Sequence, residues 1–445
     1  MAADSSPMKG PLRRHPANPR YFTDDSGRAI LLTGSHTWNN LVDMGPTDPP
    51  PRFDHDTYLK WLSAYPHNFF RLWTWELVSW DTRGNREVKP RMHQAAPQPW
   101  KRTGPGNALD GKPKFNLKEF DEAYFARLRQ RMKAAQDQGI YAAVMLFEGW
   151  GVQFSPGAWR HHPFHPDNNV NGINGDLDGD GMGLEIHTGR SREVTELQRA
   201  YVRKVVDTVN EFDHTLYEIS NENHPPSTPW QYDMIRLIHD YERAKPKQHP
   251  VGMTFQYKGG SNATLFASPA DWISPNTEGG YRDNPPPADG SKVILNDTDH
   301  LWGIGGNVAW VWKSLLRGLN PIFMDPYKRS VLDGGPEAKW EPVRQAMGQA
   351  LRFSRRVDLA TLTPRGDLVS SKFCLANPGA DYLAFLPAGG SNLTVILPAG
   401  SFRSSWLHAV TGQETPEERF SHAGGTKAFT PPIQGEALLY VQSAP

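Results

Sequence analysis

The feature that most constrains the fold is an alternation of short apolar runs with longer stretches of helical spacing. Eight runs have the length of a buried strand. They are Ile30–Thr33, Phe69–Trp73, Tyr141–Phe147, Leu216–Ser220, Val251–Phe255, Asp271–Ser274, Val293–Asn296 and Pro321–Met324. Eight strand–helix repeats over about 300 residues are typical of a (β/α)8 TIM barrel. We therefore predict an α/β chain built on such a barrel.

Between several of these runs, apolar residues recur at the spacing of an amphipathic helix. The stretches with this pattern are Asp54–Ala64, Leu117–Gln138, Ser191–Glu211 and Trp230–Ala244. An open, doubly wound sheet is the alternative arrangement of the same elements. That arrangement usually carries a Gly-rich phosphate loop after its first strand, and none follows the first run here.

The two ends of the chain differ from its middle. Residues 1–16 are rich in Pro, Ser and Arg without periodicity, so we expect a flexible N-terminal tail. Residues 17–355 hold the predicted catalytic barrel. Residues 356–445 contain short β-like runs separated by Gly, Pro and Asn, which is typical of a small all-β sandwich.

Charge and composition narrow the class of partner. Lys+Arg and Asp+Glu are both 48, so the chain lacks the basic excess that binds nucleic acid or anionic membranes. Its 15 Trp residues exceed ordinary usage, and those that do not serve the core would suit a sugar, whose C–H faces stack on flat rings. The single cysteine, Cys374, permits no internal disulfide and lies in a strand-like run, so we expect a buried thiol.

No apolar run is long enough for a membrane span, and residues 1–14 lack the apolar segment of a signal peptide. We expect a soluble protein with no membrane partner. Its compartment, whether cytoplasm, periplasm or exterior, is not resolved by the sequence.

Acidic residues follow two of the predicted strands. In a TIM barrel the active residues stand at the C-terminal ends of strands. Glu222 follows the fourth run, and Asp297 and Asp299 follow the seventh. Hydrolysis of a glycosidic bond needs two carboxyl groups, one to protonate the leaving oxygen and one to attack or to activate water. Capping of a helix N-terminus is the alternative role for any one of these acids.

Further polar and aromatic residues follow the other runs and are predicted to bind or shape a sugar. They are His36, Trp38, Arg71, Trp73, Trp150, Asn221, Tyr281 and Trp302. His224 and His300, each close to a predicted catalytic acid, are expected to orient substrate through hydrogen bonds.

The pair Asn221-Glu222 resembles the acid/base motif of the clan A glycoside hydrolases. That resemblance implies that Glu222 is the acid/base and that Asn221 contacts the sugar 2-hydroxyl. His67–Leu72 resembles the second-strand motif of the clan, which implies that Arg71 supports the nucleophile. The clan's nucleophile is a Glu closing strand seven, whereas this chain has Asp297 and Asp299 there. Both aspartates remain candidates, and retention and inversion both remain open.

Within this clan the chain is most similar to the apiosidase-like group, whose members carry a C-terminal β-sandwich of a collagen-binding type. Asn18–Phe22 and Leu32–Trp38 resemble the opening of that group. The resemblance extends from about residue 17 to the end of the chain. It implies a barrel and a sandwich, in agreement with the pattern of elements.

An acidic loop between the third and fourth runs has the ligand spacing of a calcium loop. Its candidate ligands are Asn174, Asp176, Asp178, Asp180 and Glu185, with a turn at Gly179. Such an ion would stabilise a loop over the cleft, and we expect no cofactor in the chemistry. A solvated, glycine-rich surface turn is the alternative interpretation.

The predicted function is therefore a glycoside hydrolase that cleaves a poly- or oligosaccharide with two carboxyl groups. The alternatives are a non-catalytic carbohydrate-binding protein on a TIM barrel and a metal-dependent hydrolase on the same fold. The sequence specifies neither the sugar and linkage, nor exo or endo action, nor the oligomeric state.

Overall fold

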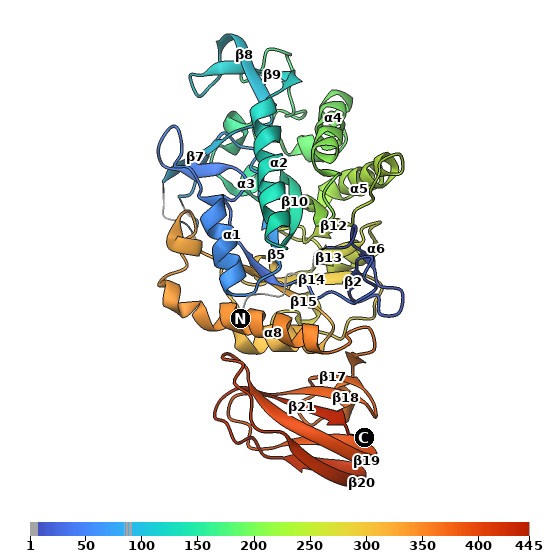
Figure 1. The fold of residues 1–445 in the computed structure, drawn as a ribbon. Helices are drawn as coiled ribbons and strands as arrows, with labels where there is room; N and C mark the ends of the chain where they lie inside the picture. The colour runs from blue at the N-terminus through green and yellow to red at the C-terminus, as the bar shows by residue number, and fades with distance from the viewer. Residues whose placement is uncertain (1–7, 84, 86–87, 89–90, 445) are drawn as a thin grey trace.

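A computed structural model describes residues 8–83, 85, 88 and 91–444. Its centre is a barrel of eight parallel strands, ordered around the barrel as they occur in the chain (Figure 1). The strands are β3 (Gly34–His36), β5 (Phe69–Leu72), β10 (Tyr141–Glu148), β11 (Thr215–Asn221), β12 (Val251–Thr254), β13 (Trp272–Ser274), β14 (Val293–Asp297) and β15 (Asn320–Met324). The predicted TIM barrel is confirmed.

The barrel closes between β3 and β5 through the side chain and backbone of Asn68. Its N–H donates to the carbonyl of Thr33 (3.0 Å), and its side chain bonds the Thr33 N–H and the Leu31 carbonyl. The Leu32 N–H donates to Asn320 Oδ1 (3.0 Å). The prediction of the first strand at Ile30–Thr33 is wrong for this reason. Side-chain amides bind the backbone of this run, and the strand forms only at Gly34–His36.

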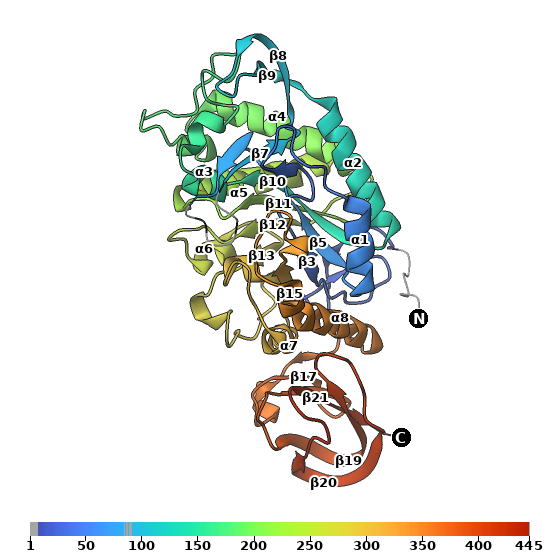
Figure 2. The same cartoon turned by 90° about the vertical axis from the view of Figure 1, so that its left-hand side faces the viewer.

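Helices surround the barrel, as Figure 2 shows. They are α1 (His55–Ala64), α2 (Glu122–Asp137), α3 (Trp150–Phe154), α4 (Arg192–Val209), α5 (Thr228–Glu242), α6 (Asn262–Ala267), α7 (Val308–Leu316) and α8 (Glu341–Arg356). Short 3₁₀ turns lie at Ala158–His161, Leu184–His187, Pro225–Ser227, Glu278–Gly280, Thr298–His300, Tyr327–Arg329, Glu337–Lys339 and Gly366–Leu368. None of the helices in the described part of the chain is both long enough and apolar enough to span a bilayer.

The loops at the carboxyl end of the barrel carry additional β-structure that the sequence did not predict. One hairpin consists of β8 (Trp100–Asn107) and β9 (Pro113–Phe120), and a small sheet consists of β4 (Asp43–Gly45), β6 (Ser79–Asp81) and β7 (Met92–Ala96). The helix predicted from Leu117 therefore begins at Glu122. Asp121 caps it by accepting the Ala123 N–H (3.0 Å), which sets the boundary.

The expectation of a flexible tail over residues 1–16 is wrong for residues 8–16. There β1 (Arg13–Arg14) pairs with β2 (Phe22–Thr23), and the side chains of Leu12 and His15 are buried. Leu12 packs with Phe22 and Leu32 against the barrel strands, so burial of apolar surface holds this segment in place. Residues 1–7 lie outside the described residues.

The C-terminal part is an antiparallel sheet that bends into a sandwich below the barrel (Figures 1 and 2). Its strands are β16 (Thr363–Pro364), β17 (Cys374–Asn377), β18 (Asp381–Leu386), β19 (Leu393–His408), β20 (Glu418–Phe429) and β21 (Ala437–Ser443). β20 escaped prediction because most of its side chains are exposed and polar. The Cys374 thiol is buried as expected, and this burial raises its pKa to about 12.

The sandwich rests directly on the helices of the barrel. Trp312 of α7 donates its indole N–H to the carbonyl of Ala409 (2.8 Å), and the Phe353 ring of α8 meets the Tyr440 ring edge-on. Apolar residues on this side of the sheet, such as Leu383 and Leu438, belong to the same buried cluster as the barrel helices. This shared core makes the sandwich a support for the barrel.

Candidate active site

The inside of the barrel changes from apolar to charged over one pleat. Phe69, Leu216 and Leu295 are fully buried in an apolar layer. Two residues further along the same strands lie Arg71, Glu218 and Asp297. Because alternate residues of a strand face the same side, these three side chains form the next layer toward the carboxyl end of the barrel.

Arg71 is the centre of this charged layer. Its Nε and one terminal nitrogen form a two-pronged ion pair with Glu218, at 2.8 and 2.6 Å. Its other terminal nitrogen lies 3.2 Å from Asp297 and 2.8 Å from Asp299. The terminal nitrogen that pairs with Glu218 also donates to Asn221 Oδ1 at 2.5 Å. One guanidinium therefore joins the ends of β11 and β14, as the planar fork of arginine allows.

Asp297 is enclosed by donors. Trp73 donates its indole N–H to His36 Nδ1 (2.9 Å), so the ring proton lies on Nε2, which donates to Asp297 (2.9–3.0 Å). The Asp299 N–H donates to the same carboxylate (3.0 Å). Burial alone would raise the pKa of Asp297, but His36 and Arg71 outweigh it and hold the pKa well below its usual range.

Asp299 lies beside Asp297 but is less enclosed, with 7% of the residue exposed against 1% for Asp297. Burial and the neighbouring Asp297 carboxylate raise the pKa of Asp299, against the opposing effect of Arg71. Two carboxylates that share one cation are thus driven to different affinities for a proton.

Glu222 immediately follows Asn221 at the end of β11 and has a left-handed backbone, with φ +42°. Such a conformation is costly for a residue with a side chain and persists where the surroundings enforce it. Gln153 of α3 donates to the Glu222 carbonyl (2.8 Å) and so fixes this turn. The residue is 8% exposed and therefore lies at the boundary between the barrel interior and solvent.

The two predicted orienting histidines form hydrogen bonds to neutral groups, and His300 Nε2 also lies 3.6 Å from Asp299 Oδ2. The Ser274 hydroxyl lies 2.7 Å from His300 Nδ1, and His300 Nε2 lies 3.3 Å from Asn221 Oδ1. His224 Nε2 donates to the carbonyl of Leu184 (2.9 Å). Burial lowers the pKa of His300 to about 3 and that of His224 to about 4, so both rings are neutral at pH 7.

The aromatic residues predicted to shape sugar subsites divide into two groups. Trp38, Trp73 and Tyr281 are buried, as is His36, so their side chains offer little open surface in this structure. These rings pack on one another or on the core, and their contact with a substrate stays a prediction. Trp150 and Trp302 are only partly buried and keep surface open to a ligand.

Three glutamates at or near this site were missed as functional candidates: Glu218 and Glu148 are buried, and Glu76 is partly buried. Glu218 pairs with Arg71, and a charged residue inside the apolar run Leu216–Ser220 was the available signal. Glu148 closes β10 and accepts the backbone N–H groups of Trp150 and Gly151, both at 2.8 Å. Burial, with Glu76 nearby, raises the pKa of Glu148 to about 8.

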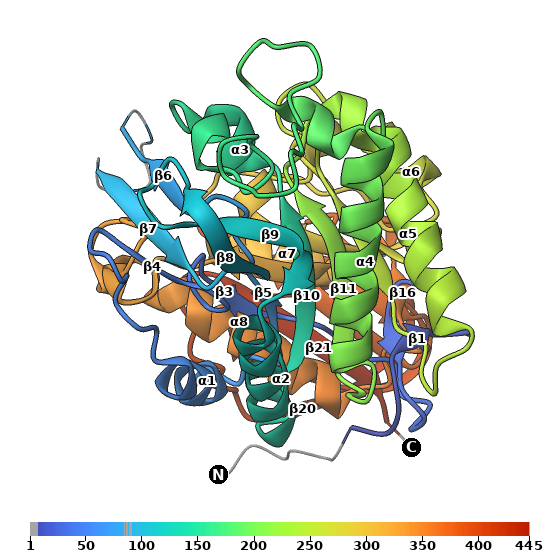
Figure 3. The same ribbon diagram turned by 90° about the horizontal axis from the view of Figure 1, so that it is seen from above.

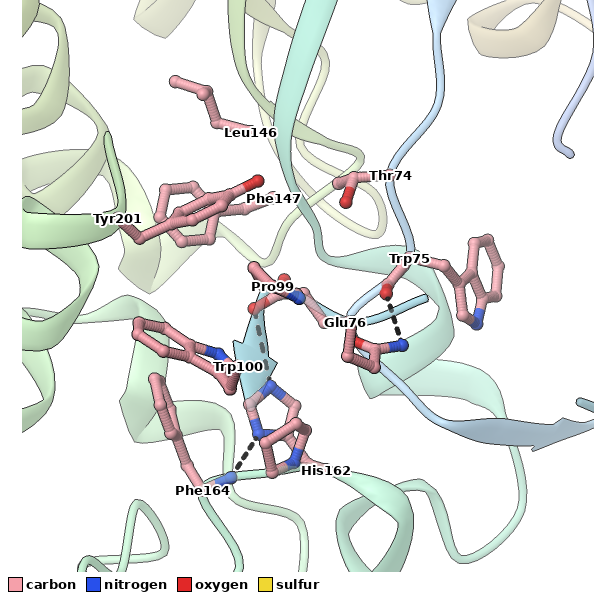
Figure 4. Close-up of a pocket in the computed structure, with 12 residues that line it drawn as sticks. Thr74, Trp75, Glu76, Pro99, Trp100, Leu146, Phe147, His162, Phe164 and Tyr201 are labelled. Atoms are coloured by element: carbon pink, nitrogen blue, oxygen red, sulfur yellow. Dashed lines mark hydrogen bonds and ion pairs between the residues drawn. The ribbon is translucent and has the colours of Figure 1, made fainter. Parts of the chain in front are cut away.

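Glu76 binds the backbone of Glu148 and two histidines. It accepts the Glu148 N–H (2.9 Å) and contacts His187 and His162. Burial would raise its pKa, but the two histidines lower it to about 2. Figure 4 shows Glu76 and His162 lining a small cavity together with the rings of Trp100, Phe147 and Tyr201. This cavity lies in the packing around Glu76 and is mainly apolar.

The acidic loop brings together some of its predicted ligands. Ligand oxygens of Asp176, Asp178 and Glu185 lie within 4.8 Å of one another. The carboxylate of Asp180 instead accepts the Met182 N–H (2.7 Å) and is not in this group. Asn174 Oδ1 accepts the Asp176 N–H (3.1 Å) at the start of the loop.

Comparison with known proteins gives a fold and a partial family match. Residues 82–258 match the family described as "Domain of unknown function (DUF6298)". No curated protein matches the chain.

Three similar solved structures are glycoside hydrolases by description. A glycoside hydrolase family 5 protein from Bacteroides vulgatus ATCC 8482 has a TM-score of 0.61 at 10% identity, with 98% of this chain and 94% of that chain covered. A structure described as "Glycoside hydrolase" has a TM-score of 0.60 at 10% identity, with 98% and 97% covered. A putative glycoside hydrolase from B. vulgatus has a TM-score of 0.59 at 11% identity, with 100% and 84% covered. These likenesses establish a fold shared with glycoside hydrolases over the whole chain.

Proposed function

We propose that the chain is a glycoside hydrolase that cleaves a poly- or oligosaccharide with two carboxyl groups at the mouth of the barrel. One observation carries this proposal: Arg71, fully buried, binds Asp297, Asp299 and the side-chain oxygen of Asn221, the residue that precedes Glu222 in the chain. A cation that joins the end of β11 to the end of β14 keeps the acids of both strands on one side of the barrel. That arrangement is what a sugar between two carboxyl groups requires.

In this mechanism Glu222 is the general acid. It donates its proton to the glycosidic oxygen as the bond from that oxygen to the anomeric carbon breaks, and the electron pair stays on the leaving oxygen. The second carboxylate then either attacks the anomeric carbon or takes a proton from the water that attacks it. In the first case the deprotonated Glu222 takes a proton from the water that hydrolyses the glycosyl-enzyme, which frees the carboxylate and restores the acid form of Glu222. In the second case the carboxylate releases the proton to solvent and Glu222 takes one up from solvent before the next turnover.

For the second carboxylate we favour Asp299 over Asp297. His36, Arg71 and the Asp299 N–H already occupy the oxygens of Asp297, which is 1% exposed. Asp299 has fewer donors and more open surface. Asp297 then acts as a positioning residue that holds Arg71 and His36, while Asp299 faces the sugar.

The family assignment is part of the same proposal. Asn221-Glu222 and Arg71 support membership of clan A, and the openings Asn18–Phe22 and Leu32–Trp38 support the apiosidase-like group within it. The fold shared with a family 5 enzyme agrees with the clan. Carbohydrate is the proposed substrate, and Trp150 and Trp302 are proposed as the rings that it contacts.

The test is Glu222→Gln, assayed with oligosaccharides and with dinitrophenyl glycosides. Loss of the general acid should lower kcat on oligosaccharides by about 100- to 10,000-fold. Dinitrophenolate leaves without protonation, so the same variant should lose much less activity on dinitrophenyl glycosides. The matched control is Glu278→Gln, a glutamate that also follows a barrel strand but binds Ser261 and Asn262 of the α6 cap.

The proposal fails if Glu222→Gln turns over oligosaccharides at the native rate. Glycan binding by the native chain without turnover, unchanged in Glu222→Gln, would instead identify a carbohydrate-binding protein. A loss of equal size on both classes of substrate would remove Glu222 from the role of acid.

A further inference from the structure

The acidic loop between α3 and α4 contains a second candidate site, well separated in sequence from the catalytic strands. In Figure 3 this segment is the green loop that extends beyond α3. Its carboxylates are Asp176, Asp178, Asp180 and Glu185. None of the four forms an ion pair with a Lys, Arg or His in the part of the chain that the structure describes.

The backbone of the loop is folded by its own acids. Asp176 accepts the N–H groups of Gly179 and Gly181, both at 3.0 Å, and Asp178 accepts the Asp180 N–H (3.2 Å). Gly179 and Gly181 have φ of +76° and +80°, which glycine adopts without strain. These bonds leave the three ligand oxygens of Asp176, Asp178 and Glu185 within 4.8 Å of one another.

Glu185 provides the independent observation. The residue is only 8% exposed, and its Oε2 is buried without a hydrogen-bond partner among the described residues. A buried carboxylate oxygen without a donor is unfavourable unless a cation meets it. A Glu185 oxygen is also one of the three close ligand atoms. The carboxylate that has an oxygen without a donor is therefore part of the acidic cluster.

We propose that this loop binds a calcium ion through Asp176, Asp178 and Glu185. Hard carboxylate oxygens at alternating positions, followed by a later Glu, match what calcium accepts in a flexible coordination shell. Magnesium fits less well, because it demands near-ideal octahedral geometry and keeps its waters. The position of Asp180 in the loop is one at which a calcium loop uses the backbone carbonyl, so its side chain is free to bond Met182.

An ion bound at this loop would affect the residues around Glu222 through the turn that contains Glu185. The Leu184 carbonyl of that turn accepts from His224, two residues after Glu222. The Ile186 carbonyl accepts from Gln198 of α4 (2.8 Å). An ion on Glu185 would therefore fix the turn that supports His224, without taking part in proton transfer.

The experiment is calorimetric titration of the chelator-treated full chain with CaCl₂, combined with thermal unfolding. We expect one site with a Kd on the order of 10 to 100 µM. Calcium at about 100 times its Kd should raise Tm by roughly 3 °C for a chain of this length. Glu185→Gln should weaken binding about tenfold or more, since it removes one of three charged ligands.

The Tm measured in the presence of chelator distinguishes a variant that has lost the calcium site from one whose fold is destabilised. Glu185→Gln should be at least as stable as the native chain there, because it removes an uncompensated buried charge. Asp167→Asn, an exposed acid before the loop, is the control and should keep the full calcium response. The proposal is overturned if CaCl₂ produces neither heat nor a change in Tm, if Glu185→Gln responds like the native chain, or if MgCl₂ binds equally well. The readouts do not involve hydrolysis, so they are independent of the role of Glu222.

Discussion

Replacement of Arg71 by lysine tests whether one guanidinium holds the charged layer of the barrel together. Arg71 reaches four acceptor side chains, namely Glu218, Asp297, Asp299 and Asn221. A lysine ammonium is a single point of charge and cannot pair with Glu218 and with the aspartates at once. At least two buried acceptors then lose their donor, which costs about 1 to 3 kcal/mol each. The free energy of unfolding should therefore fall by about 2 to 6 kcal/mol.

This free energy converts to a measurable shift in Tm. An unfolding entropy of about 2.1 cal/mol/K per residue gives about 0.9 kcal/mol per degree for this chain, so Tm should fall by about 2 to 7 °C. Hydrolysis should fall by at least about 100-fold, because an ångström of misplacement at the reacting groups has that effect. Scanning calorimetry and a glycoside assay on the same sample measure both quantities.

The matched control is Glu242→Gln, at the opposite end of the barrel. Glu242 is a buried hub that accepts from Asn210, Tyr217 and His249. Its loss should lower Tm by a comparable amount and leave kcat within about threefold of native, because it lies far from Glu222. Arg71→Lys with native Tm and native activity would refute the argument that Arg71 organises the site.

Two further predictions concern single carboxyl groups. Asp297→Asn removes the like charge that raises the pKa of Asp299, so the acidic limb of the pH profile of kcat should move to lower pH. Asp299→Asn should abolish turnover. If only Asp297→Asn abolishes turnover, the roles of the two aspartates are reversed. The pKa of Glu148 is about 8 in the folded chain and near 4.5 in the unfolded chain, so folding favours the protonated carboxyl. The stabilisation from this protonated form is complete below pH 4.5 and is lost as pH rises to 8. The native chain should therefore lose about 3 to 5 kcal/mol of stability over this range relative to Glu148→Gln, measured by calorimetry at several pH values, and parallel pH profiles would contradict the assignment.

The barrel could be predicted because its strands are short apolar runs whose burial on both faces leaves a strong signal. The hairpin β8–β9 and strand β20 could not, because their exposed polar residues carry little apolar pattern. The displacement of the first strand to Gly34–His36 depends on the side chains of Asn68 and Asn320, which come from distant parts of the chain. Such contacts exist only after folding.

The candidate site also has features that the sequence could predict and features that it could not. Glu222, Asp297 and Asp299 could be selected as candidate acids because they follow strands, and the position of a strand end depends mainly on local sequence. Which aromatic side chains reach solvent depends on how the loops fold over one another. Trp38 and Trp150 both follow strand ends, yet Trp38 is buried among other tryptophans while Trp150 stays partly open.

In the proposed hydrolysis, the charge balance around Arg71 favours the transition state over the bound substrate. One guanidinium meets three carboxylates, so the layer carries more negative than positive charge when all are ionised. The Trp73 indole, which donates to His36, and the Asn221 amide, whose oxygen accepts from Arg71, add no positive charge of their own. An uncharged sugar does not change this balance. The oxocarbenium-like transition state of the proposed reaction would bring a positive charge next to these carboxylates, so the electrostatic stabilisation would appear only as the glycosidic bond breaks.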